Sequence, residues 1–163
     1  MFLKIWRFIT VTLAALALTM PSAHVLELPQ KMQYDAQMYS AVNTTLYRYF
    51  AYIGGFYTMG SILTAFVLAF LVRKHGLTFR WTLAGALFLL LAFGIWLTVV
   101  APVNNEVADA LKSAPESVPT IWMRLRERWE YGHVTGFFVT LIGFCLLVVS
   151  LLIEIPTRRT HYK

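Results

Sequence analysis

Two histidines in this chain each have a glutamate three residues away. His24 and Glu27 lie in the stretch "HVLEL", and Glu130 and His133 lie in the stretch "EYGH". Residues three apart on a helix share a face, so each pair presents an imidazole and a carboxylate together. Imidazole and carboxylate are typical ligands of divalent transition metals. Two histidines with one carboxylate are the usual set in non-haem iron enzymes that use oxygen.

The segments that carry these pairs have the composition of a membrane protein. Hydrophobic residues make up 58% of the 163 residues and charged residues only 13%, whereas soluble domains carry about 25% charged residues. Four stretches are almost free of charge and approach the roughly 20 residues that cross a bilayer. These stretches are 8–23, 51–72, 81–100 and 134–153.

We therefore predict an all-α fold, a four-transmembrane-helix bundle that forms a single domain over residues 1–163. The predicted helices span about 3–28, 44–72, 78–101 and 120–155. Proline 102 is expected to end the third helix. In the loop that follows, Val107 and Leu111 are spaced as the inward face of a short amphipathic helix.

The basic residues predict an orientation. They precede the first helix, separate the second from the third, and follow the fourth: Lys4, Arg7, Arg73, Lys74, Arg80, Arg158, Arg159 and Lys163. By the positive-inside rule, both termini are cytoplasmic and the longer loops, 24–50 and 101–132, lie on the outer side. The net charge of +6 is then a topology signal, so no nucleic-acid partner is expected. The expected location is the inner membrane of a bacterium, and association of several copies is left open.

The first apolar stretch allows two interpretations. Lys4 and Arg7 precede it and Pro21-Ser22-Ala23 follows it, as in a secretory signal peptide. Cleavage prefers small residues at both −1 and −3, and Pro21 suits the −3 position poorly. We favour a retained helix that is kinked at Pro21 and ended by Pro29.

Two further predictions concern the second helix. Asn43 is expected to be its N-cap, because its side chain can accept a hydrogen bond from the first turn. Ala51 and Gly55, with Gly54 and Thr58 beside them, form a small-residue face that lets another helix approach closely.

The predicted topology brings polar groups of all four helices to the outer side. Ionisable groups near hydrocarbon are costly unless they are paired, solvated or bound to metal, so they indicate function. We predict His24 and His133 as metal ligands, Glu27 or Glu130 as the anionic ligand, and the other glutamate as the proton acceptor. Asn104 is expected to orient the ligand or the substrate. The residues expected to bind substrate or balance its charge are Lys31, Tyr47, Asn105, Arg128 and Trp129.

Several alternatives stay open at this point. The expected metal is iron or copper, with zinc as a further candidate. A haem held by His24 and His133 would also suit a four-helix bundle, and a metal-free acid–base site is a third form of chemistry. In a non-catalytic membrane subunit or assembly partner, the two His–Glu pairs would be local ion pairs. Arg126 and Lys31 would then balance the remaining charge. Arg126 is also spaced to pair with Glu130, four residues on.

Three stretches resemble signatures of a known family. They are "HVLELPQK", "APVNNEV" and "RLRERWEYGH", and they are similar to motifs of the anthrone-oxygenase-like family of small four-helix integral membrane proteins. Most members of that family have no known function. The resemblance is strongest at Pro102, Asn104, Arg128, Trp129 and His133.

The resemblance implies a membrane location. It also implies oxidation of a phenolic tricycle by oxygen, as in the characterised fungal members. Gly136 and Phe137 stand where many relatives carry a basic residue. Residues and resemblance together predict a metal-dependent oxidoreductase or oxygenase that acts on a small hydrophobic substrate, aromatic or quinone-like.

Overall fold

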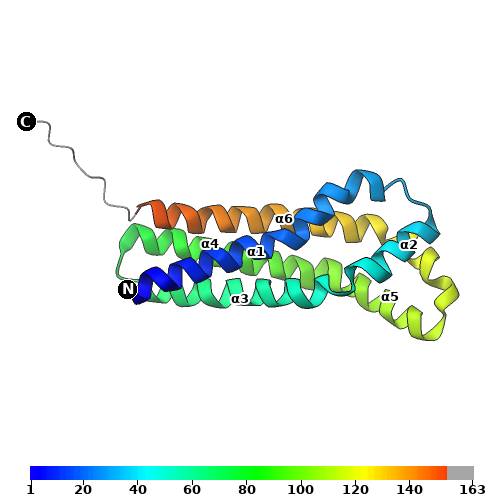
Figure 1. Cartoon of the computed structure of the whole chain (residues 1–163), viewed down its shortest axis with the longest axis horizontal. Coiled ribbons are helices and arrows are strands. Elements are labelled where there is room, and N and C mark those ends of the chain that lie inside the picture. The colour runs from blue at the N-terminus through cyan, green and yellow to red at the C-terminus, as the bar shows by residue number, and fades with distance from the viewer. Residues whose placement is uncertain (154–163) are drawn as a thin grey trace, which may run out of the picture.

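The computed structural model describes residues 1–153, with Arg48 described by its backbone alone. These residues are almost entirely helical and contain no strand. Four long helices lie side by side in an elongated bundle (Figure 1). They are α1 (Phe2–Lys31), α3 (Phe50–Leu71), α4 (Gly76–Ile95) and α6 (Val118–Ile153). The described part of the chain has four helical segments long and apolar enough to cross a membrane, which confirms the predicted fold class.

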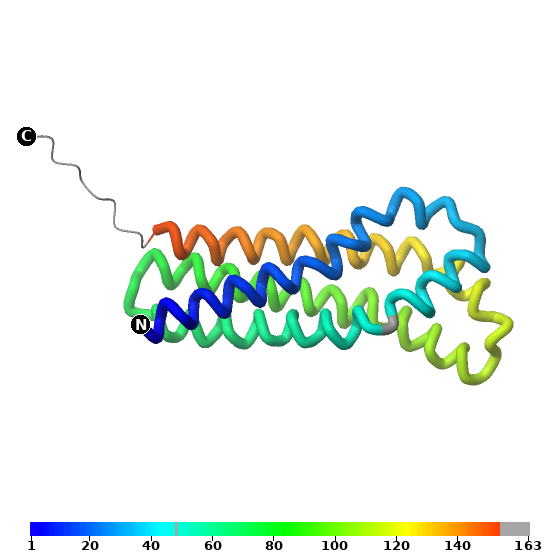
Figure 2. Tube along the Cα trace, in the orientation of Figure 1, coloured from blue at the N-terminus to red at the C-terminus, as the bar shows by residue number. Residues whose placement is uncertain are grey.

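The bundle has a simple order. Helix α1 packs against α3 and α6, and α4 packs against α3 and most extensively against α6. The N-terminus and the end of α6 lie at the same end of the bundle (Figures 1 and 2), as the predicted topology requires. Which end faces the cytoplasm stays a prediction. The basic residues Arg158, Arg159 and Lys163 and the predicted end of the last helix at 155 lie outside the described residues.

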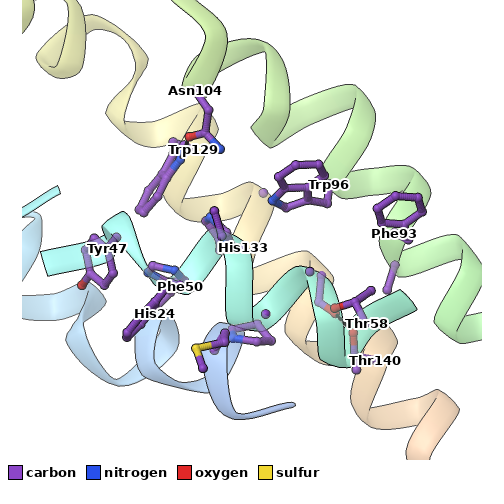
Figure 3. Close-up of a pocket in the computed structure, with 18 of the residues that line it drawn as sticks. His24, Tyr47, Phe50, Thr58, Phe93, Trp96, Asn104, Trp129, His133 and Thr140 are labelled. Carbon is purple, nitrogen blue, oxygen red and sulfur yellow. Dashed lines mark hydrogen bonds between the residues drawn. The ribbon is translucent and has the colours of Figure 1, made fainter. Parts of the chain in front are cut away.

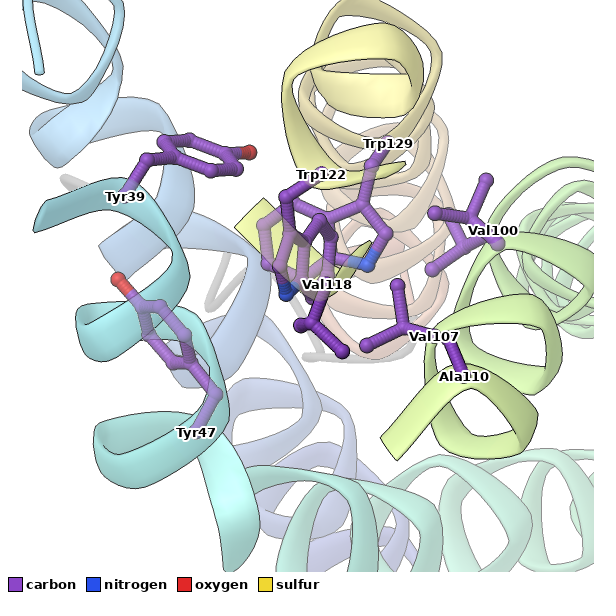
Figure 4. Packing of buried hydrophobic residues seen from close by; sticks show 9 residues of the cluster. Tyr39, Tyr47, Val100, Val107, Ala110, Val118, Trp122 and Trp129 are labelled. Atoms are coloured by element: carbon purple, nitrogen blue, oxygen red, sulfur yellow. The ribbon is translucent and has the colours of Figure 1, made fainter. Parts of the chain in front are cut away.

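The opposite end of the bundle carries a cap of short elements. The cap consists of α2 (Ala36–Thr45), η1 (Leu46–Arg48), α5 (Ala101–Ser113), η3 (Pro115–Ser117) and the first turns of α6. A π-helical turn, η2 (Trp96–Val100), joins α4 to α5. Nine buried apolar residues fill the cap and are called the cap core (Figure 4). They are Tyr39, Tyr47, Val100, Val103, Val107, Ala110, Val118, Trp122 and Trp129.

A second core lies between the four long helices, nearer to the N-terminal end. This bundle core contains Ala14, Ile62, Ala65, Ala86, Leu89 and Leu147. Helices α4 and α6 approach most closely at Gly85 and Gly143, where an added Cβ on either glycine would lie within 3.1 Å of the other's carbonyl oxygen. Large apolar side chains such as Phe8, Phe56 and Leu63 are exposed on the outside, as lipid contact allows.

The predicted small-residue face on the second helix is only partly a packing face. A Cβ on Gly54 would lie 3.1 Å from Cγ of Met20, so α1 does approach α3 closely there. A Cβ on Gly55 would meet nothing within 4 Å. The closest helix contact is instead the α4–α6 crossing, which the sequence analysis did not identify.

The prediction that Pro102 ends the third helix is wrong. The chain continues through η2 into α5, with Pro102 in the first turn of α5. Proline has no N–H, so it leaves unbonded the carbonyl of the residue four positions earlier. That carbonyl belongs to Thr98, and the Arg128 guanidinium donates to it at 3.2 Å. A wider π turn and a substitute donor thus let the helix pass the proline.

Three smaller predictions also need correction. Asn43 lies in the last turn of α2 and caps nothing, whereas the carboxylate of Asp35 caps α2 by accepting from the Met38 N–H at 2.8 Å. Helix α1 passes Pro29 and ends at Lys31. In α5, Val107 is buried as predicted, but Leu111 is exposed and Ala110 takes the inward position.

Candidate functional site

A cavity of about 340 Å³ lies between the cap core and the bundle core (Figure 3). Its size is at the lower end of the range for small-molecule sites, about 300–1,000 Å³. Aromatic rings and small residues form most of its wall, and every long helix contributes to it. The labelled residues in Figure 3 come from α1 (His24), η1 (Tyr47), α3 (Phe50, Thr58), α4 (Phe93), η2 (Trp96), α5 (Asn104) and α6 (Trp129, His133, Thr140).

The two predicted histidines meet at this cavity. The ring centroids of His24 and His133 are 4.0 Å apart, and their planes are inclined by 30°. Trp129 contacts both rings edge-on, with centroid distances of 4.8 Å to His24 and 4.4 Å to His133. His24 is buried, and its Nδ1 has no hydrogen-bond partner among the described residues. Two imidazolium ions at this distance would repel strongly, so at most one ring carries a charge.

Glu130 does not pair with His133. Its Oε1 contacts the Lys31 ammonium at 2.7 Å and accepts a hydrogen bond from the Tyr39 hydroxyl at 2.8 Å. All three side chains are at most 2% exposed. Burial raises the pKa of the Tyr39 phenol, so the hydroxyl stays protonated and remains a donor. We call these three residues the buried ion network.

Lys31 also connects the network to the cavity wall. Its ammonium lies 4.6 Å from the ring centroids of both Tyr47 and Trp129. A cation over an aromatic face is attracted by the ring quadrupole, and the attraction grows when water is excluded. The network therefore fixes two of the rings that surround the histidines.

The predicted pairs His24–Glu27 and Arg126–Glu130 are not formed either, because Glu27 and Arg126 contact other groups. Glu27 accepts a hydrogen bond from the Tyr47 hydroxyl. Arg126 donates to the backbone carbonyl of Tyr34 at 3.1 Å, and the expected Arg126–Glu130 pair is not formed. Both carboxylates of the two His–Glu motifs thus bind residues from other helices. In this structure the motifs are not local ion pairs.

The predicted site residues divide into two groups. His24, Tyr47, Asn104, Trp129 and His133 line the cavity, and Asn104 Oδ1 accepts from the Trp129 indole N–H at 2.8 Å. The second group lies outside the cavity wall: Glu27, Lys31, Asn105, Arg128 and Glu130. Asn105 and Arg128 are exposed, so their predicted contact with substrate has no geometric support here.

The predicted site residues omit several polar residues of the wall. Asn43 and Trp122 are two that line the cavity and are buried. Asn43 was interpreted as a helix cap, and Trp122 was not among the predicted site residues. The available signal for Asn43 was an amide close in sequence to several tyrosines, but a capping role also explained that amide.

The donor set fits the predicted metal centre poorly. Within residues 1–153, no three or more His, Cys, Asp and Glu side chains come close enough together to bind one metal ion. His24 and His133 offer two imidazole ligands, but the carboxylates expected beside them are engaged elsewhere. Their stacked contact also leaves no room for a porphyrin between the two rings, as two axial ligands would require.

A comparison with protein families gives a match to the anthrone oxygenase model over residues 48–146. The match covers more than half of the chain. The chain belongs to the anthrone oxygenase family. A comparison with curated proteins and with solved structures found no match. In this anthrone oxygenase family member, the matched region contains Asn104, Trp129 and His133, whereas His24 and Lys31 come from α1, which precedes it.

The buried ion network gives a first prediction. Replacing Lys31 by Met, or Glu130 by Gln, leaves the partner charge buried without its counter-ion. Each single variant should therefore lose about 3–5 kcal/mol of unfolding free energy. The double variant Lys31→Met/Glu130→Gln should recover most of that loss, because neither charge remains. Chemical unfolding in detergent measures all three variants.

The exposed pair Lys112–Asp109 supplies the control, because Lys112→Met should change stability little. If the double variant is no more stable than the worse single variant, the two charges do not stabilise each other and the prediction is wrong.

Proposed function

We propose that this protein is a membrane oxygenase that converts the activated methylene of an anthrone-like phenolic tricycle to a carbonyl. The observation that carries the proposal is the aromatic cavity in which the rings of His24 and His133 contact each other. Membership of the anthrone oxygenase family supports the same reaction. A flat polycyclic substrate suits a wall that includes the rings of Tyr47, Phe50, Phe93, Trp96 and Trp129.

Oxidation of the anthrone methylene requires a base that removes a proton more than it requires a set of metal ligands. The methylene of an anthrone is acidic because its carbanion is delocalised over the fused rings. A neutral imidazole accepts this proton, and the carbanion gives its electrons to dioxygen, forming a C–O bond. The resulting hydroperoxide loses water and leaves the carbonyl. One oxygen atom of O₂ enters the product, and the other leaves as water with the two methylene hydrogens.

We propose different roles for the two histidines. His133 is partly exposed within the wall, whereas His24 is only 3% exposed. We assign His133 as the base and His24 as the residue that positions it by ring stacking. General base catalysis by a positioned side chain accelerates a reaction by roughly 10²–10⁴-fold.

The substrate is proposed to arrive from the bilayer. The cap core closes one end of the cavity and the bundle core closes the other. Of the described lining residues, Ala51 and Gly55 alone are exposed, and both lie on α3. Their neighbours Tyr52 and Phe56 are exposed apolar residues on the same helix. An opening at this position faces lipid, where a hydrophobic tricycle concentrates.

Metal-assisted oxidation is a second candidate, because His24 and His133 lie close enough to offer two nitrogen ligands. Iron or copper bound there would supply redox chemistry toward oxygen. A third candidate is a non-catalytic membrane subunit, in which the cavity has no substrate. The following experiments separate these three.

Replacing His133 by Gln removes the proposed base while keeping a polar side chain of similar reach. The rate of quinone formation from 1,8-dihydroxyanthrone, followed by visible absorbance under air, should fall by about 10²–10³-fold. His75→Gln is the control, because His75 lies in the connection between α3 and α4, outside the cavity wall. An unchanged rate in His133→Gln excludes His133 as the base. A wild-type rate no faster than empty micelles favours the non-catalytic subunit.

Metal removal distinguishes the two catalytic candidates. If His133 acts as a base, dialysis against a strong chelator should leave the rate of quinone formation unchanged. Elemental analysis of the dialysed protein should then find less than about 0.1 metal ion per chain, which is too little to occupy one site. Two results together would instead establish the metal candidate. The wild type would contain near-stoichiometric iron or copper that the variant His24→Ala/His133→Ala lacks, and chelation would abolish activity.

Filling the cavity should block the reaction. A Cβ on Gly136 meets nothing within 4 Å, and Gly136 lines the cavity, so Gly136→Leu should place its side chain in substrate space. Turnover of the tricycle should fall by at least about tenfold, with the fold retained by circular dichroism. Gly94→Leu is the matched control, because Gly94 also has open space around it but does not line the cavity. Equal turnover in both variants would place the substrate elsewhere.

A further inference from the structure

Three buried polar side chains of the cavity wall have atoms that lack hydrogen-bond partners among the described residues, and besides His24 these are Asn43 and Trp122. Neither Nδ2 nor Oδ1 of Asn43 has a partner among the described residues, and the same is true of the Trp122 indole N–H. Asn43 is 7% exposed and Trp122 is 4% exposed. Buried polar groups in folded proteins are nearly always bonded, so exceptions in a cavity indicate a ligand that bonds to them.

The surrounding polar groups are already paired with one another. The Trp129 N–H bonds Asn104, the Tyr39 hydroxyl bonds Glu130, and the Tyr47 hydroxyl bonds Glu27. The Asn43 amide lies close to the Tyr39 hydroxyl, yet the two form no hydrogen bond of acceptable geometry. Within the described residues of this wall, Asn43 and Trp122, besides His24, therefore keep hydrogen-bonding capacity that the fold itself does not use.

Both residues belong to the capped end of the cavity. Trp122 packs edge-on against Tyr39 and Trp129, with ring centroids 5.7 Å and 5.5 Å apart (Figure 4). Asn43 comes from α2, one helical turn after Tyr39. Packing against two rings holds the Trp122 indole N–H in a fixed position, which is what directional recognition of a ligand requires.

We propose that Asn43 and Trp122 bind the oxygen-bearing edge of the substrate and so select a hydroxylated, carbonyl-containing tricycle. The pair offers N–H donors from both side chains and one amide oxygen acceptor. A carbonyl oxygen with adjacent phenolic hydroxyls supplies the matching acceptors and donors. In such an anthrone the reactive methylene lies on the ring edge opposite the carbonyl. Holding the oxygen-bearing edge therefore determines where the methylene points.

This inference rests on the proposed function for its substrate class, but its test needs no turnover. The probes are 1,8-dihydroxyanthraquinone and anthracene, which share the ring skeleton and differ in their oxygens. Equilibrium dialysis in detergent micelles, with protein-free micelles as the reference, gives the affinity of each probe. The wild type should bind the dihydroxyquinone at least about tenfold more tightly than anthracene, because a site built for hydrogen bonds rejects an analogue that lacks them.

The variants remove hydrogen-bonding groups while keeping an apolar side chain at each position. Asn43→Leu and Trp122→Phe should each reduce the preference for the dihydroxyquinone to below about threefold, with anthracene binding retained as proof of an intact cavity. Asn105→Leu is the control, because the Asn105 side chain is exposed and does not line the cavity. Trp122→Phe keeps an aromatic ring in the cap core. If Asn43→Leu does not fold, the ratio of the two probe affinities in Trp122→Phe decides whether the recognition role holds.

The outcomes separate the two proposals. An unchanged preference in Trp122→Phe, or a wild type that does not prefer the dihydroxyquinone, overturns the recognition role even if the enzyme oxidises anthrones. A preference that both variants lose supports the recognition role even if the wild type forms no quinone, in which case the proposed oxygenase function fails instead.

Discussion

The buried ion pair between Lys31 and Glu130 organises the capped end of the bundle. Neither charge tolerates this environment alone, because removing a charge from water costs several kcal/mol unless a partner compensates. The pair therefore joins the end of α1 to α6, and the Tyr39 hydroxyl adds α2 to the same carboxylate. It also gives a reason for α1 to continue past Pro29, since only a longer helix carries Lys31 to Glu130.

The same pair also determines which groups remain beside the histidines. Glu130 compensates Lys31, and Glu27 bonds Tyr47, so neither carboxylate is directed at the histidines. His24 and His133 contact each other among aromatic rings. This arrangement supports the proposed role of an imidazole as the base, because the carboxylates expected to complete a metal centre have other partners.

The sequence predicts the four long helices well because hydrocarbon imposes one length and one composition on each of them. It also predicts that His24 and His133 share one end of the bundle, since helices that alternate in direction bring those ends together. It does not predict the partners of the glutamates. Spacing along one helix shows which residues are able to meet, but a side chain from another helix competes for the same carboxylate, as Lys31 does for Glu130.

Pro102 shows the same limit for the backbone. A proline within an apolar helix normally indicates its end, because one carbonyl loses its donor. Here Arg128, thirty residues away in sequence, donates to the carbonyl of Thr98, and η2 widens the turn. The helix therefore continues into α5 and carries Asn104 to Trp129. Trp129 packs against both histidines. The hydrogen bond from Arg128 to the Thr98 carbonyl, on the outside of the bundle, therefore helps to position the proposed base inside it.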